Sequence, residues 1–218
     1  MIRPEVQVAG GSRLGPNQGQ GAHVAPFLQA TAIIDFDSPG VCAQAAALRD
    51  PEGDPVATAR ACFEWVRDEI RHSADYRLNP VTCSASEVLA AGTGYCYAKA
   101  HLLVALLRAN GIPAGLAYQR LGVGPAGPPY CTHGLSAVYL PGHGWYRVDP
   151  RGNKPGVDAQ FTPPEERLAY IPSGPEEYDF PGIHAVPLPE IVRVLRRWKT
   201  WDKLYAYLPD LQGRKGTK

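Results

Sequence analysis

What this chain of 218 residues lacks excludes several classes of protein. It has no excess of charge of one sign: 22 lysines and arginines stand against 21 acidic residues, for a formal net charge of +1. No sequence-wide field therefore attracts nucleic acid or an anionic membrane, and we expect neither partner. The longest apolar run, Leu102 to Leu107, is far too short to span a bilayer. The first residues lack the apolar segment of a secretory signal, which predicts a cytoplasmic protein.

Cysteines are few, and they do not pair along the sequence. Five occur, at positions 42, 62, 83, 96 and 131, with no C-x-x-C spacing between them. An odd, scattered set in a chain of this size argues against a disulfide framework. Zinc is also disfavoured, because Cys131 and His133 form the only close Cys/His pair and no second pair completes four ligands. We therefore expect no metal and no cofactor, and we expect Cys42 and Cys62 to be buried, inert thiols.

The composition that is present is ordinary for a globular protein, with 44% hydrophobic and 20% charged residues. The length allows one sizeable core, and it does not suggest two full domains. Residues 9–21 are polar and rich in glycine, and we interpret residues 1–30 as a partly irregular N-terminal arm. We expect residues 31–187 to form the main domain, with a helix and tail from residues 188–218 packed on it.

Capping signals and apolar spacing predict three helices before residue 111. Asp54 and Pro55 open the first, whose apolar residues recur at helical spacing: Val56, Ala59, Phe63, Val66 and Ile70. A capping box, Ser84 to Glu87, opens a short second helix. The third runs from about Tyr95 to Ala109 and ends at Asn110-Gly111. Because it is apolar nearly all round, we expect it to be buried in the centre of the domain.

Strand patterns follow these helices. The predicted strands are Ala114 to Leu121, Gly134 to Leu140 and Trp145 to Asp149, with a loop over residues 122–129 and a turn over 141–144. Two other segments are predicted less directly. Thr31 to Phe36 is a short apolar run that suggests an edge strand, and Leu188 to Leu208 reads as one basic amphipathic helix. Helices followed by an antiparallel sheet predict an α+β fold in which the central buried helix packs on that sheet.

Three residues at the ends of these elements carry chemistry. Cys96 follows a loop marked by Gly92 and Gly94, and it opens the central helix. A helix N-terminus carries roughly half a positive charge and unpaired N–H groups, which stabilise a thiolate and can receive an oxyanion. His133 opens one predicted strand and Asp149 closes the next. A thiol, a base that takes its proton and an acid that orients the base are the parts of a cysteine nucleophile.

The hairpin register decides whether His133 and Asp149 can meet. A three-residue turn pairs Leu140 with Gly144. That register sets Asp149 opposite Leu135, which is diagonal to His133, so the two side chains share a face of the sheet. We predict this register or an equivalent bulge, because a two-residue turn would send the two side chains to opposite faces.

These residues and their surroundings resemble the transglutaminase-like superfamily. The similarity lies in Ser84–Leu89, Gly94–Cys96, Ala105–Ala114, His133 and Val138–Pro150, which together cover roughly residues 60 to 152. The resemblance implies a papain-like core in which Cys96, His133 and Asp149 form a Cys-His-Asp triad. It also implies acyl transfer through a thioester on the cysteine. Many prokaryote-type members of the superfamily look like cysteine proteases.

The chain departs from the family pattern at several points. Gly134-Leu135 follows the histidine where the family often has Ala-Trp, so the substrate channel is expected to differ in shape. Neither the acidic calcium cluster of the animal enzymes nor the C-x-x-C pairs of the zinc-bearing peptide N-glycanase branch are evident. Four residues are candidates for oxyanion binding or for lining the site: Gly94, Tyr95, Tyr97 and Tyr76. Three histidines are interpreted as structural: His72, His101 and His143.

The leading prediction is a cysteine enzyme that hydrolyses a peptide or amide bond in a peptide or protein substrate. One alternative is a protein-glutamine gamma-glutamyltransferase, a transglutaminase, in which an amine resolves the thioester in place of water. The other is a non-catalytic scaffold that docks a partner through the basic residues near the C-terminus, namely Arg193, Arg196, Arg197, Trp198 and Lys199. The presence of all three catalytic residue types favours an enzyme. The substrate and the oligomeric state stay open.

Overall fold

The computed structural model describes residues 24–124 and 127–212. The loop predicted for residues 9–21 and most of the arm predicted for residues 1–30 lie outside this range. The elements in chain order are η1 (Ala25–Leu28), α2 (Pro39–Ala47), α3 (Pro55–Glu69), β1 (Arg71–His72), α4 (Ser73–Tyr76), α5 (Ala85–Ala91), β2 (Thr93–Gly94), α6 (Cys96–Ala109), β3 (Ala114–Gly124), β4 (Gly127–Leu140), β5 (Gly144–Val148), β6 (Gln160–Thr162), β7 (Glu165–Arg167), β8 (Tyr178–Asp179), α7 (Pro189–Arg197) and α8 (Trp201–Ala206).

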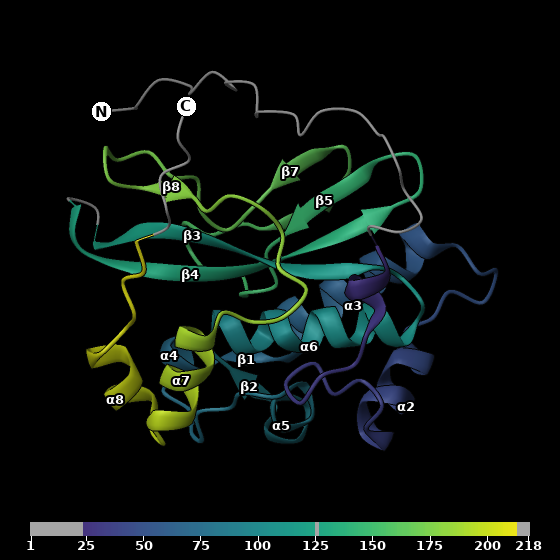
Figure 1. Cartoon of the computed structure of the whole chain (residues 1–218), viewed down its shortest axis with the longest axis horizontal. Helices are drawn as coiled ribbons and strands as arrows, with labels where there is room; N and C mark the ends of the chain where they lie inside the picture. Colours follow the sequence, from purple (N-terminus) through teal and green to yellow (C-terminus); the bar gives the residue numbers. More distant parts are fainter. Residues whose placement is uncertain (1–23, 125–126, 213–218) are drawn as a thin grey trace.

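Helix α6 is the centre of the fold, as its sequence predicts. All of its residues from Cys96 to Arg108 are buried. One side of the helix packs against β3 and β4, and α2, α3 and α5 pack around the rest of it (Figure 1). A helix that is apolar nearly all round can be stable only in such a place, because every face meets another element.

The antiparallel sheet has the strand order β5-β4-β3-β8. Leu140 pairs with Gly144, and Ser136 pairs with Val148. This confirms the predicted hairpin register, and the next residue beyond β5 is Asp149. The fold is therefore α+β, with a papain-like arrangement of a central helix on a curled antiparallel sheet.

The two predicted N-terminal caps are present. The Asp54 carboxylate accepts a hydrogen bond of 2.8 Å from the main-chain N–H of Val56 and opens α3. At α5 the capping box is complete: the Ser84 hydroxyl accepts from the N–H of Glu87, and the Glu87 carboxylate accepts from the N–H of Ser84. Each cap satisfies donors that the first turn of a helix leaves unpaired.

Three sequence-based expectations about elements are wrong. Residues 31–36 form bends and no strand, because the Thr31 hydroxyl accepts hydrogen bonds from the N–H groups of Ile33 and Ile34 and so curls the chain locally. The single helix predicted over residues 188–208 is two helices, separated by extended backbone at Trp198 and Thr200. The loop predicted over residues 122–129 is shorter, since β3 continues to residue 124 and β4 begins at residue 127.

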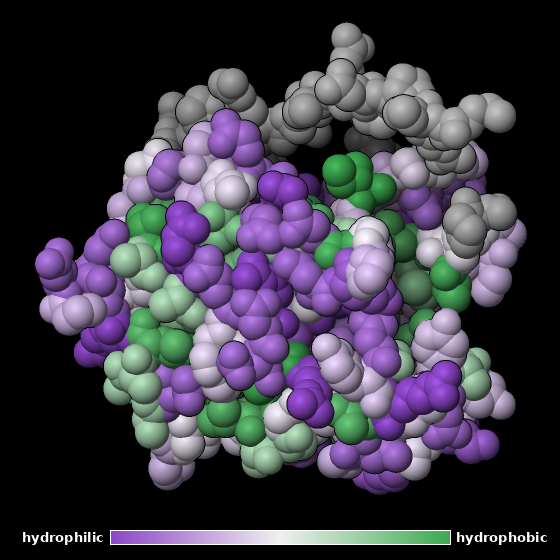
Figure 2. All heavy atoms as spheres, turned by 180° about the vertical axis from the view of Figure 1, so that it is seen from behind, coloured by the Kyte–Doolittle hydropathy of each residue, from purple (hydrophilic) through white to green (hydrophobic). Residues whose placement is uncertain are grey.

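The surface seen in Figure 2 is mainly polar, with scattered small clusters of apolar residues. On the face shown in Figure 2, hydrophilic residues predominate and the hydrophobic ones lie singly or in small groups. Cys42 is exposed and its thiol donates to the Phe36 carbonyl, so the prediction of a buried thiol is wrong there; Cys62 is buried as predicted. Within the described part of the chain, no helix combines the length and the apolar character that crossing a bilayer requires.

Candidate active site

Cys96 is the first residue of α6, and a short extended segment leads into it. Thr93 and Gly94 form β2, which pairs in parallel with β1. A side chain at Gly94 would crowd the first turn, because a Cβ there would lie 3.2 Å from the Cβ of Ala98. Tyr95 is the N-cap of α6 and makes no side-chain capping bond to it. The N–H groups of the first turn are therefore left free of a cap and can receive an oxyanion beside the Cys96 sulfur.

His133 and Asp149 meet directly, as the hairpin register requires. Nε2 of His133 lies 2.7 Å from Oδ2 of Asp149. The carboxylate is fully buried and also accepts from the main-chain N–H groups of Arg151 and Ala169, at 3.2 and 3.3 Å. These bonds fix the carboxylate. Because Nε2 faces Asp149, Nδ1 is the ring nitrogen left for a thiol.

The surroundings of His133 favour the protonated ring. Burial lowers the pKa of a histidine, since it takes the charged form out of water. In this site the charges of the Asp149 carboxylate and the Cys96 thiolate, together with hydrogen bonding to both side chains, outweigh burial and raise the pKa of His133 to about 10. Cys96 is therefore one of the groups that hold the ring in its charged form.

Tyr97, the residue after Cys96, packs on the strand that carries His133. Its hydroxyl donates a hydrogen bond to the main-chain carbonyl of Thr132, just before the histidine. Just after the histidine, a Cβ on Gly134 would lie 2.7 Å from the Tyr97 ring and 3.1 Å from its Cα. The glycine therefore lets β4 approach the start of α6 closely, and Tyr97 contacts both neighbours of the catalytic histidine candidate.

The comparison with protein families fits this geometry. The family model of the transglutaminase-like superfamily matches residues 43–150, a range that includes Cys96, His133 and Asp149. This chain belongs to the transglutaminase-like superfamily. Membership supports a cysteine-dependent enzyme in general and leaves the reaction open.

Two solved proteins resemble parts of this transglutaminase-like chain. A candidate cysteine protease from Cytophaga hutchinsonii is 21% identical, with a TM-score of 0.48, over 60% of this chain and 42% of that one. The periplasmic domain of TgpA from Pseudomonas aeruginosa is 27% identical, with a TM-score of 0.43, over 57% of this chain and 45% of that one. The chain thus spans less than half the length of each. No curated protein matches it.

The four lining candidates of this transglutaminase-like site have different surroundings. Gly94 is buried in β2. Tyr95 is buried and donates its hydroxyl proton to the Trp201 carbonyl at 2.6 Å, and Tyr97 is buried against β4, so both phenols are already bonded. Tyr76 is 59% exposed and lines a pocket that His72 and Lys99 also line. Of the four, Tyr76 alone presents a large side chain surface to a ligand.

Several residues near the site were missed by sequence reasoning. His72, interpreted as structural, pairs with Gly94 across β1 and β2, and its ring lies 5.5 Å from that of Tyr95. The Tyr170 ring stands edge-on to His133, with centroids 5.2 Å apart. Arg151 contacts two carboxylates of the site. Its main-chain N–H donates to Asp149, and its guanidinium pairs with Asp75, which lies near His72. No local pattern marks these residues, because tertiary packing alone brings them together.

The other histidines fit their structural interpretation. His101 is fully buried in α6, where Nδ1 lies 2.7 Å from the Cys83 carbonyl, and burial lowers its pKa to about 4. His143 is exposed in the turn between β4 and β5. Across residues 24–124 and 127–212, no three His, Cys, Asp or Glu side chains are grouped so that they could hold a metal ion.

Proposed function

We propose that the chain is a cysteine-dependent acyl-transfer enzyme that hydrolyses a peptide or amide bond through a thioester on Cys96. The observation that carries the proposal is the 2.7 Å contact of His133 with Asp149, next to a cysteine at the start of a buried helix. Membership of the superfamily supports a cysteine enzyme in general. Hydrolysis of a peptide or protein is the more specific part of this proposal.

In the first half-reaction the Cys96 thiolate attacks the carbonyl carbon of the scissile amide. A carbon–sulfur bond forms, and the carbonyl electrons move to the oxygen, which the N–H of Cys96 can stabilise. When the intermediate collapses, the carbon–nitrogen bond breaks and His133 gives its proton to the leaving amine. Asp149 keeps the ring oriented and stabilises its positive charge. The products are a thioester on Cys96 and a free amine.

In the second half-reaction water attacks the thioester. His133, now neutral, takes a proton from the water, and the oxygen forms a bond to the acyl carbon. The carbon–sulfur bond then breaks, which releases a carboxylic acid and restores the thiolate and the imidazolium. A primary amine in place of water would give a new amide, which is the transglutaminase alternative.

One experiment separates these outcomes. A glutamine peptide is incubated with the protein and a labelled primary amine, and both ammonia and labelled peptide are measured. Ammonia release without label incorporation supports hydrolysis, whereas incorporation supports the transferase. Cys96→Ala should abolish either activity. Cys131→Ala, which removes another cysteine near the site, is the matched control and should stay active.

The scaffold alternative is less well supported by the C-terminal helices. On α7 the apolar residues Ile191 and Leu195 are buried in the core, so that face is not free for a partner. The basic residues lie on the outer face, where Arg196 pairs with Glu87. Trp198 stacks on Tyr207 with centroids 4.8 Å apart. These contacts fit a solvated basic face over a packed apolar one.

A further inference from the structure

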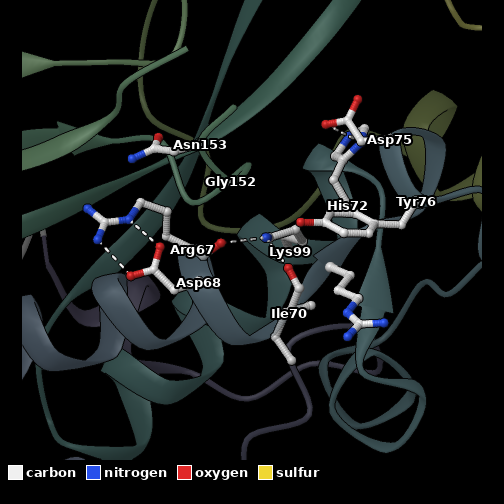
Figure 3. Close-up of a pocket in the computed structure, with 10 residues that line it drawn as sticks. Arg67, Asp68, Ile70, His72, Asp75, Tyr76, Lys99, Gly152 and Asn153 are labelled. Carbon is white, nitrogen blue, oxygen red and sulfur yellow. Dashed lines mark hydrogen bonds and ion pairs between the residues drawn. The ribbon is translucent and has the colours of Figure 1, made fainter. Parts of the chain in front are cut away.

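A pocket of about 220 Å³ lies beside β1, α4 and the first turn of α6 (Figure 3). The end of α3, the segment of β1 and α4, one residue of α6 and the chain after Asp149 form its wall. Typical sites for drug-sized ligands measure roughly 300–1,000 Å³. A pocket of this size therefore fits one residue or one chain terminus of a longer substrate.

The pocket lies one helical turn from the nucleophile. Lys99 lines it and follows Cys96 by three residues on α6, a spacing that sets two side chains on one face of a helix. His72 also lines it and pairs with Gly94, two residues before Cys96. A group held in this pocket can thus belong to the residue whose amide the sulfur attacks, or to its neighbour.

Two buried side chains of the pocket have unused hydrogen-bonding capacity. Lys99 is fully buried, and its ammonium donates to the carbonyls of Arg67 and Ile70, which uses two of its three protons. Among the described residues no carboxylate lies within ion-pair distance of it. His72 is 7% exposed, and its Nδ1 has no hydrogen-bond partner there, since the nearest Asp75 oxygen is 3.6 Å away. A lysine is almost never fully buried unless an opposite charge pairs with it, and Lys99 has no such ion pair among the described residues.

The acids of the pocket are already paired. Arg67 binds Asp68 with two bonds of 2.7 Å. Asp75 is bound by Arg151 and Lys154, each at 2.8 Å. Burial opposes the ionisation of Asp75, but these hydrogen bonds outweigh it and lower the pKa of Asp75 to about 2. Its negative charge is therefore fully present and offset by two cations.

This pairing leaves the pocket with positive charge. Arg71 stands exposed at the rim, 5.5 Å from the centroid of the Tyr76 ring. Like Lys99, it has no carboxylate partner within ion-pair distance in the described part of the chain. A cation at the rim and a second at the base of a small, polar pocket favour an anionic ligand group.

We propose that this pocket binds a carboxylate of the substrate, held by Lys99, His72 and Arg71, on the residue whose amide is attacked or on its neighbour. As a substrate assignment this rests on the proposed function. The carboxylate is either the side chain of an acidic residue or a free chain terminus, which share the same chemistry. Binding of the C-terminal carbonyls of α3 explains two of the bonds of Lys99, but among the residues that the structure describes it leaves Nδ1 of His72 without a hydrogen bond and Arg71 without a carboxylate partner.

The ionisation of Lys99 agrees with this assignment. Burial, assisted by the charge of Arg151, lowers the pKa of Lys99 to about 7, although Asp149, Asp68 and Asp75 act in the opposite direction. The ammonium is therefore poorly stabilised while the pocket holds no anion. A bound carboxylate would supply the missing counter-charge.

The test measures binding in Cys96→Ala, which separates the pocket from catalysis. Three probes are titrated calorimetrically: N-acetyl-glutamate methylamide with only a side-chain carboxylate, N-acetyl-glutamine with only a terminal one, and N-acetyl-glutamine methylamide with neither. At least one carboxylated probe should bind about 10-fold or more tightly than the neutral one, and the tighter of the two identifies the source. Equal binding of all three, or no binding of any, overturns the proposal.

Variants link that preference to the named residues. Arg71→Gln changes an exposed rim residue and should reduce the preference for carboxylate about 3-fold or more, whereas Arg193→Gln, exposed on α7, should leave it unchanged. Lys99→Met should remove most of the preference; if that variant does not fold, Arg71→Gln decides by itself. An unchanged preference in Arg71→Gln contradicts the proposal. Carboxylate binding without turnover by the intact enzyme would instead sink the proposed function alone, and turnover without the preference would sink the pocket alone.

Discussion

The hydroxyl of Tyr97 is hydrogen-bonded to the main-chain carbonyl of Thr132. Tyr97 follows Cys96, the proposed nucleophile, and Thr132 precedes His133. This one hydrogen bond therefore connects the start of α6 to the strand that carries the histidine. Asp149 fixes the histidine from the other side, through its 2.7 Å contact with Nε2. The relative position of sulfur and imidazole therefore depends on the contact between α6 and β4 as much as on the catalytic side chains.

Tyr97→Phe should weaken that contact and keep the ring in place. The buried carbonyl of Thr132 loses its partner, which costs about 1–3 kcal/mol of unfolding free energy. We expect kcat to fall while KM changes little, because the ring still fills its space and the pocket is untouched. Urea denaturation and steady-state kinetics measure the two effects. Tyr205→Phe, at a half-exposed position of α8, is the control and should change neither.

Gly134→Ala should separate the sulfur from the imidazole. Its Cβ would meet the ring of Tyr97 at 2.7 Å and the main chain of α6 at 3.1 Å, and the main chain cannot rotate away. Overpacking of this kind costs about 1–3 kcal/mol. We expect activity to fall more steeply than stability, as measured by kcat/KM and chemical denaturation. In a Tyr97→Ala background the same glycine change should cost less stability than it does in the wild type, because the ring clash is gone. A fully active Gly134→Ala would show that the close approach is unimportant.

Asp149→Asn should move the pH profile of activity. In the wild type the pKa of His133 is about 10, and the asparagine keeps the shape of the carboxylate without its charge. The alkaline limb of kcat/KM should shift to lower pH, and kcat should fall by roughly 10²–10⁴-fold. An alkaline limb that stays in place would mean that Asp149 does not set the protonation of the ring.

His133 and Lys99 change the pH dependence of the unfolding free energy in opposite directions. His133 has a pKa of about 10 in the folded chain against about 6.5 unfolded, so its stabilising contribution is full below pH ~6.5 and is lost as the pH rises to ~10. Lys99 has a pKa of about 7 when folded against about 10.4 unfolded, so the unfolded chain binds more protons between those values. Lys99 therefore makes the unfolding free energy rise with pH in this window.

Two variants resolve these opposing slopes. Lys99→Met should make the unfolding free energy fall more steeply between pH ~7 and ~10, whatever its absolute value. Asp149→Asn should make it fall less steeply, because it removes the charge that raises the pKa of His133. Urea denaturation at pH 7, 8.5 and 10 gives both slopes. Parallel curves for the wild type and both variants would contradict the assigned ionisations.

Local signals explain which elements the sequence predicts well. The caps at Asp54 and Ser84, and the Asn110-Gly111 stop, are short-range features, and α3, α5 and α6 begin and end where those features indicate. The register of β4 and β5 follows from turn length and strand parity, which are also local. The pairing of His133 with Asp149 could be anticipated for that reason.

The errors and omissions have tertiary causes. The pattern of residues 188–208 is helical throughout, but Trp198 takes an extended conformation and stacks on Tyr207, which breaks the helix. Lys99 looks like a surface residue in the sequence, and only the end of α3 supplies the carbonyls that bury it. His72 gains its position from the pairing of β1 with β2, two strands of two residues each that carry no periodic signal.

The most direct test of the account is where an acyl group forms a covalent bond to the protein. The wild type is treated at pH 7 with an activated acyl ester, quenched in acid and mapped by mass spectrometry. The acyl group should appear on Cys96. The other thiols are internal controls: burial raises the pKa of Cys62 and Cys131 to about 12 and that of Cys83 to about 11, and Cys42 is exposed and far from the triad in sequence. His133→Ala should abolish the adduct. Acylation of Cys42 in preference to Cys96, or an unchanged Cys96 adduct in His133→Ala, would contradict the account.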